Sequence, residues 1–73
     1  MSQQQIKVGN LFLEAAKKTL EAKIKNAEAK VSLYLTELVG VGEHPEITQE
    51  IIKAAEEGAH AQDVLDFISQ RWN

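Results

Sequence analysis

The chain has 73 residues, 44% of them hydrophobic and 26% charged, and a formal net charge of −3 at pH 7. This length allows one domain and leaves little room for a scaffold with a separate active site, so we expect a protein that is not an enzyme. The absence of cysteine excludes disulfides, thiol nucleophiles and cysteine-rich zinc sites. No apolar run approaches the roughly 18 residues that cross a bilayer, and no signal peptide pattern is visible, so we expect no membrane partner and a cytoplasmic location.

The first residues of the chain offer two alternative starts for a helix. Ser2 with Gln5 resembles a capping box, whereas Gly9 and Asn10 provide a second N-cap position. We predict that the main helix begins at about Asn10. Residues 1–9 then form an N-terminal arm or a frayed first turn.

Apolar residues recur every three or four positions over residues 10–39, which predicts an amphipathic helix there. The stripe expected to face a second helix is Leu13, Ala16, Leu20, Ile24, Ala27, Val31, Leu35 and Leu38. Its steps repeat every eleven residues, which indicates a nearly straight helix.

Glycine and proline cluster at one place in the chain, residues 40–45. A glycine just past a helix end relieves the steric cost of the left-handed conformation, and a proline suits the first turn of the next helix. We therefore predict a turn over residues 40–44 and a second helix over about 45–72. The turn residues are Gly40, Gly42, Glu43, His44 and Pro45.

The second helix carries its own apolar stripe, with steps of four and three throughout. The stripe is Ile47, Ile51, Ala54, Gly58, Ala61, Leu65, Ile68 and Trp72. A short turn pairs residues whose numbers sum to about 85, so Ala27 should face Gly58, and the helices should approach most closely there. The alternative explanation for Gly58 is a local weak point or hinge. The fold class predicted is all-α, an antiparallel two-helix hairpin.

A second set of apolar residues lies outside this predicted seam. A single hairpin of this size is marginally stable alone, so we predict that two copies dimerise into a four-helix bundle that covers the second set. The candidate interaction residues are Leu11, Phe12, Leu33, Tyr34, Ile52, Val64 and Phe67. The simpler alternative is that they are scattered surface residues.

The polar residues give no pattern for a catalytic, cofactor or metal site. A zinc site needs three or four convergent ligands, and the chain has two histidines, His44 and His60. His44 is better explained as a residue at or near the N-cap, where the acidic Glu43 and Glu46 interact favourably with the helix dipole. His60 and Asp63 lie one turn apart on the expected solvent face. We predict no catalytic, cofactor or metal residue.

Lysines are concentrated in the first half of the chain, which suggests a nucleic-acid accessory protein as the alternative function. Residues 1–42 hold six lysines and four glutamates, whereas residues 43–73 hold seven acidic residues and two basic ones. Glutamate and lysine alternate at steps of three and four from Glu14 to Glu28, as on a self-compensated solvent face. We therefore expect no nucleic-acid partner, and the leading hypothesis is a non-enzymatic protein–protein interaction module.

A resemblance to known proteins rests on three stretches: Ser32-Leu33-Tyr34-Leu35, Val39-Gly40-Val41-Gly42-Glu43-His44-Pro45 and Ala59-His60-Ala61-Gln62-Asp63-Val64-Leu65. They resemble short uncharacterised proteins of tailed phages, including phages that infect cyanobacteria, over about the C-terminal half of the chain. The resemblance implies a small helical phage accessory protein that acts on a host or phage protein in the cytoplasm of the infected cell. It implies no active-site residue.

Overall fold

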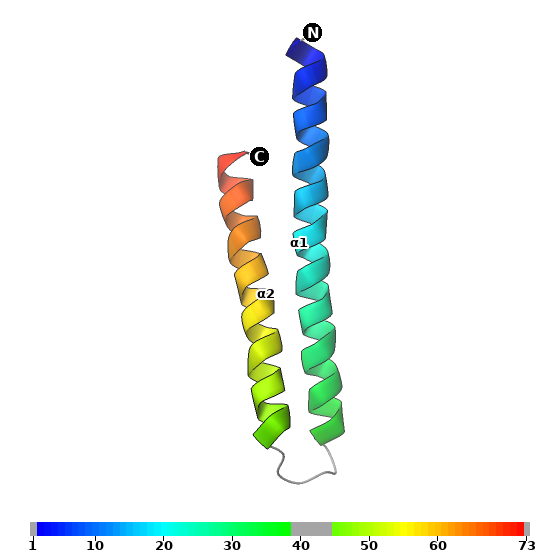
Figure 1. The fold of residues 1–73 in the computed structure, drawn as a ribbon, viewed down its shortest axis with the longest axis vertical. Helices are drawn as coiled ribbons and strands as arrows, with labels where there is room; N and C mark the ends of the chain where they lie inside the picture. The colour runs from blue at the N-terminus through cyan, green and yellow to red at the C-terminus, as the bar shows by residue number, and fades with distance from the viewer. Residues whose placement is uncertain (1, 39–44, 73) are drawn as a thin grey trace.

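The computed structural model is an all-α hairpin of two helices, α1 (Ser2–Leu38) and α2 (Pro45–Arg71). It describes residues 2–38 and 45–72, and side chains within residues 9–36 and 46–72. The two helices run antiparallel side by side, and the N-terminal part of α1 extends beyond the C-terminal end of α2 (Figure 1). The predicted two-helix hairpin is confirmed. Of the predicted turn residues, Gly40, Gly42, Glu43 and His44 lie outside the described residues, and Pro45 is the first residue of α2.

The helix α1 begins earlier than the main helix predicted from the sequence. Its first residue is Ser2, so residues 2–9 are helical and do not form a separate arm. Gly9 costs about 1 kcal/mol relative to alanine in a helix interior. Each residue that extends an existing helix also adds a backbone hydrogen bond, so one glycine does not stop the helix.

The core along the seam is thin and consists of small side chains. Among the side chains that the structure describes, the buried hydrophobic residues are three alanines, Ala27, Ala54 and Ala61, with exposed fractions of 6%, 3% and 2%. Among the described residues, no large side chain is fully buried. Leucine, isoleucine and valine side chains beside the alanines are only partly covered. The described part of the hairpin therefore lacks the layer of buried large residues that stabilises most domains.

Gly58 lies where the two helices approach most closely. A Cβ atom added to Gly58 would be 2.9 Å from the Cβ of Ala27, closer than two carbon atoms can pack. This contact confirms the predicted pairing of Ala27 with Gly58. It also gives a steric reason for a glycine in the middle of α2, which is continuous through this position.

The seam follows a seven-residue repeat, and not the eleven-residue repeat predicted for α1. The covered positions of α1 continue from Ala27 to Val31 and Tyr34, whereas Leu35 is 53% exposed. Two helices that wrap around each other keep contact only at an average spacing of 3.5 residues, and the stripe of α2 already has that spacing. The predicted roles of Tyr34 and Leu35 are therefore exchanged.

The C-terminal end of the predicted seam also differs. The rule that facing residues have numbers summing to about 85 pairs Trp72 with Leu13, but Trp72 lies one residue beyond α2 and is 57% exposed. Its backbone N–H still donates a hydrogen bond of 2.9 Å to the carbonyl of Ile68. The indole ring meets the ring of Phe67 edge-on, with 6.1 Å between the ring centroids.

The molecule is a rod of 62 × 16 × 13 Å with a radius of gyration of 17.3 Å. A compact domain of this length would have a radius of gyration of about 11 Å. The accessible surface is 5989 Å², whereas a folded monomer of this mass exposes about 4500 Å². In the part of the chain that the structure describes, no helix combines the length and apolarity needed to cross a bilayer.

Candidate interaction surface

An open groove lies on each side of the seam, and these grooves differ in chemistry. The charged groove, of about 440 Å³, is lined by Leu20, Lys23, Asn26, Ala27, Lys30, Glu57, His60, Ala61 and Val64. The apolar groove, of about 400 Å³, is lined by Ile24, Ala27, Glu28, Val31, Ser32, Ala55, Gly58 and Ala59. Ala27 contributes to both because the helices meet there.

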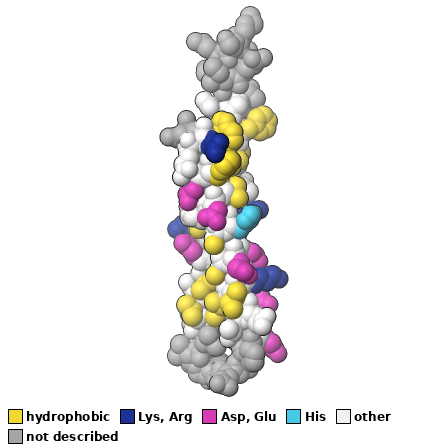
Figure 2. Space-filling model, turned by 90° about the vertical axis from the view of Figure 1, so that its left-hand side faces the viewer, with side chains coloured by type: hydrophobic (Ala, Val, Ile, Leu, Met, Phe, Trp, Pro, Cys, Tyr) yellow, Lys and Arg dark blue, Asp and Glu magenta, His cyan; other side chains and the backbone are white. Residues whose placement is uncertain are grey.

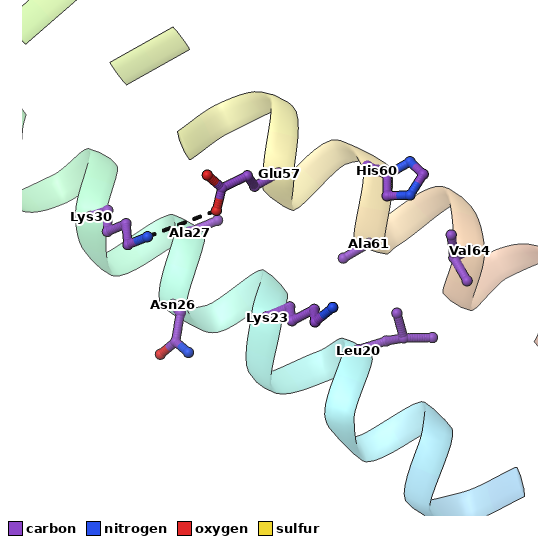
Figure 3. A pocket seen from close by; sticks show the side chains of 9 residues that line it. All are labelled: Leu20, Lys23, Asn26, Ala27, Lys30, Glu57, His60, Ala61 and Val64. Atoms are coloured by element: carbon purple, nitrogen blue, oxygen red, sulfur yellow. Dashed lines mark ion pairs between the residues drawn. The ribbon is translucent and has the colours of Figure 1, made fainter. Parts of the chain in front are cut away.

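The charged groove has an apolar floor and a charged rim. Leu20 from α1 and Val64 from α2 point into the space between the helices, and the Lys23 chain extends across it (Figure 3). One ion pair crosses the rim, with 3.8 Å between Lys30 Nζ and Glu57 Oε2. Both side chains of that pair are about half exposed, so water screens their attraction.

The apolar groove owes its shape to small residues. Ala55, Gly58 and Ala59 line its α2 side, where the absence of large side chains leaves a shallow trough beside the seam. Its one charged lining residue, Glu28, lies 3.4 Å from Lys25 Nζ in an exposed ion pair one turn along α1. Such a surface suits an apolar partner, because few polar groups would lose water on contact.

Most of the predicted interaction residues are on the surface, though they do not form one patch. Leu11, Phe12, Leu33, Ile52 and Phe67 have exposed fractions between 51% and 73%. Tyr34 and Val64 are partly buried at the edges of the seam. Leu35 and Trp72 are exposed as well, although the spacing of apolar residues predicts both in the seam. The exposure of Leu35 could have been predicted by giving α1 the same seven-residue repeat as α2, because that repeat places Tyr34 in the seam and leaves Leu35 outside it.

The apolar surface is divided between the two ends of the rod. Viewed from the side of α2, yellow apolar side chains gather towards each end, with charged side chains between them (Figure 2). Near the C-terminus of α2, Phe67 contacts Trp72 and also the guanidinium of Arg71, 4.7 Å from the ring centroid. The grooves thus lie between two exposed apolar regions.

The lysines of α1 do not form a continuous basic track. Lys23 and Lys30 line the charged groove, whereas Lys25 pairs with Glu28 beside the apolar groove. Lys17 is partly buried. Cations split between two faces and paired with glutamates are a poor match to the regular spacing of phosphates along a nucleic acid.

Within residues 2–38 and 45–72, no three His, Asp or Glu side chains gather as ligands for a metal ion. His60 and Asp63 are both exposed on α2. Glu43 and His44, the turn residues weighed as metal ligands, lie outside the described residues. The described surface therefore offers apolar and charged contacts to a partner.

Comparison of the chain with known protein families, with curated proteins and with solved structures finds no match. The likeness of the C-terminal half to phage proteins stays a prediction. The exposed apolar surface and the charges of the two helices are therefore the basis for the function proposed below.

Proposed function

We propose that this chain is a non-enzymatic protein–protein interaction module that works as a homodimer, in which two hairpins pack into an antiparallel four-helix bundle. The observation that supports this most directly is the core, whose buried hydrophobic residues within 9–36 and 46–72 are three alanines. A domain needs large buried side chains to offset the entropy lost on folding. A second hairpin would supply the missing layer.

The exposed area of the rod supports the same proposal. Its surface of 5989 Å² exceeds that of a compact monomer of equal mass by about 1500 Å². A stable interface of standard size buries about 800 Å² on each partner. One contact with a second copy would thus use about half of the excess and leave apolar surface for another protein.

The surface that remains is the proposed binding site for a further protein. Leu11, Phe12 and Phe67 are large and exposed, and they belong to the half of the rod that holds the start of α1 and the end of α2, which we call the free end. Exposed aromatic and aliphatic side chains of this kind are frequent anchors in protein interfaces. In the phage interpretation, the partner is a host or phage protein in the cytoplasm of the infected cell.

Sedimentation equilibrium of the full chain tests the homodimer. At micromolar concentration we expect twice the mass of the 8.1 kDa chain. Circular dichroism at the same concentration should show a cooperative thermal transition. A monomer that melts cooperatively would overturn the proposal, because the hairpin would then be stable without a cover.

Binding to nucleic acid through the lysines of α1 has weaker support, because these lysines are divided between the two groove sides. A titration with a labelled oligonucleotide at low and moderate ionic strength separates the two functions. Binding that weakens steeply with salt would favour the nucleic-acid function. Absence of binding at low ionic strength would remove it.

A further inference from the structure

We propose that the second copy docks on the apolar-groove side of the hairpin, with both hairpins pointing the same way, so that α1 of each copy lies against α2 of the other. This inference rests on the proposed homodimer and adds the face and the orientation. The face follows from the unequal chemistry of the two grooves. The orientation follows from the position of the apolar residues and from the charges of the helices.

The two grooves would impose very different desolvation costs on a partner. Covering the charged groove would take Lys23, Lys30, Glu57 and His60 out of water, which is costly unless each finds a partner. Covering the apolar groove would bury aliphatic and small side chains with Glu28 at the rim. A second hairpin therefore gains more on the apolar side.

Two exposed residues extend the apolar groove towards the end of the rod where α1 ends and α2 begins. Leu35 lies four residues after Val31, and Ile52 lies three residues before Ala55, so each shares a helix face with a residue that lines the groove. Both Leu35 and Ile52 are 53% exposed. We call the surface formed by Val31, Leu35, Ile52, Ala55 and Ala59 the apolar strip.

The apolar strip lies in one half of the rod, and this limits the orientation of the second copy. Towards the free end, the face of α1 that carries Leu35 and Glu28 continues with Glu21 and Glu14 at seven-residue steps. Two hairpins that point the same way bring their strips together and keep the rods overlapped along their length. Two fully overlapped hairpins that point in opposite directions would set the two strips at opposite ends of the assembly, where neither covers the other.

The helix charges favour the same orientation. Between residues 9 and 36, α1 carries five lysines and three glutamates, whereas α2 carries two basic and six acidic residues between 46 and 71. In the proposed arrangement, α1 of each copy, which has a net positive charge, lies beside the net negative α2 of the other, and Lys23 and Lys30 stay in water on the charged-groove side. The opposite orientation would place two acidic helices side by side, which is repulsive.

A matched pair of substitutions tests the face. Ile52 belongs to the apolar strip, whereas Leu33 lies seven residues after Asn26 on the charged-groove side, and their exposed fractions are 53% and 57%. We expect Ile52→Gln to weaken dimerisation by about tenfold to a hundredfold, because two isoleucines leave each interface. Leu33→Gln should change the dimer dissociation constant by less than about threefold.

The result of that comparison separates the face from the proposed function. If Leu33→Gln weakens the dimer as much as Ile52→Gln does, or more, the apolar strip is not the interface, although the homodimer stands. If the unsubstituted chain is a monomer, the proposed function fails before the face is tested. Circular dichroism of both variants at high concentration shows whether each still folds.

Spin labels test the orientation, because the chain has no cysteine and a single Gln49→Cys substitution, at an exposed position near the start of α2, gives one label per copy. With both hairpins pointing the same way, the two labels lie at the same height and are separated by about 30 Å across a four-helix bundle. With opposite directions, the rise along two helices separates them by about 40 Å or more. A separation in the longer range would overturn the orientation.

Discussion

Gly58 is the residue at which packing between the helices limits the choice of amino acid most tightly. Its missing side chain lets the backbone of α2 approach Ala27, and a Cβ atom there would lie 2.9 Å from the Cβ of Ala27. Gly9 is also inside a helix, yet a Cβ atom at Gly9 would meet nothing within 4 Å. The chain therefore contains its own control for the effect of a helical glycine.

We expect Gly58→Ala to lower the free energy of unfolding by about 1 kcal/mol. The gain of about 1 kcal/mol in helix propensity is smaller than the overpacking cost of roughly 1–3 kcal/mol at such a short contact. Gly9→Ala should raise the free energy of unfolding by about 1 kcal/mol, because only the helix propensity changes. Urea unfolding followed by circular dichroism, at one fixed protein concentration, measures both.

A double substitution tests the reason for the difference. In an Ala27→Gly background, the Cβ atom that makes the short contact is absent. Gly58→Ala should therefore lower the free energy of unfolding less in this background than in the unsubstituted chain. A stabilising effect of Gly58→Ala alone, equal to that of Gly9→Ala, would show that the helices do not need the close approach.

At the scale of the helices, the ion pair between Lys30 and Glu57 joins α1 to α2. Its atoms are 3.8 Å apart and its side chains are 54% and 53% exposed. We expect a double-mutant cycle with Lys30→Gln and Glu57→Gln to give a coupling of at most about 0.5 kcal/mol, decreasing as salt is added. Coupling above about 1 kcal/mol, unchanged by salt, would mean that another part of the molecule shields this pair from water.

The two helices differ in length, and this leaves part of α1 without a partner helix. The helix α1 has 37 residues and α2 has 27, so α1 projects about 15 Å beyond the end of α2. We expect removal of residues 2–9 to reduce helical circular dichroism while lowering the melting temperature by less than about 4 °C. A decrease of more than about 10 °C would show that the N-terminal turns of α1 pack against another surface.

The structure of the seam shows how far a repeat in the sequence predicts the packing of a helix. The alternation of apolar residues identified both helices and the face of α2 that packs on α1. In α1, Tyr34 and Leu35 are neighbours in sequence, and either fits an apolar stripe. The choice between them depends on how α1 and α2 wrap around each other, which one helix considered alone does not specify.

At the scale of the whole molecule, the rod exposes more surface than its mass requires, and this links its stability to its concentration. If the second copy completes the core, folding and association are one equilibrium. We expect the melting temperature to rise by roughly 5–10 °C when the protein concentration is raised a hundredfold. A melting temperature independent of concentration would identify the single hairpin as the stable unit.

The candidate interaction surface was predicted in part. The exposure of Leu11, Phe12 and Ile52 agrees with their position outside the predicted seam. The sequence did not indicate that the exposed residues divide between two ends of a rod, or that the two sides of the seam differ in charge. These properties depend on which residues of α1 lie beside which residues of α2.

The sequence by itself determined two helices, a break before Pro45 and the pairing of Ala27 with Gly58. Helix periodicity, glycine and proline act over a few residues, so these features can be identified without knowledge of the rest of the fold. The tertiary structure decided which of the two neighbours, Tyr34 or Leu35, enters the seam. It also produced one charged groove and one apolar groove. Those outcomes depend on the rotation of each helix relative to the other, because a turn of about one residue moves a different row of side chains into contact.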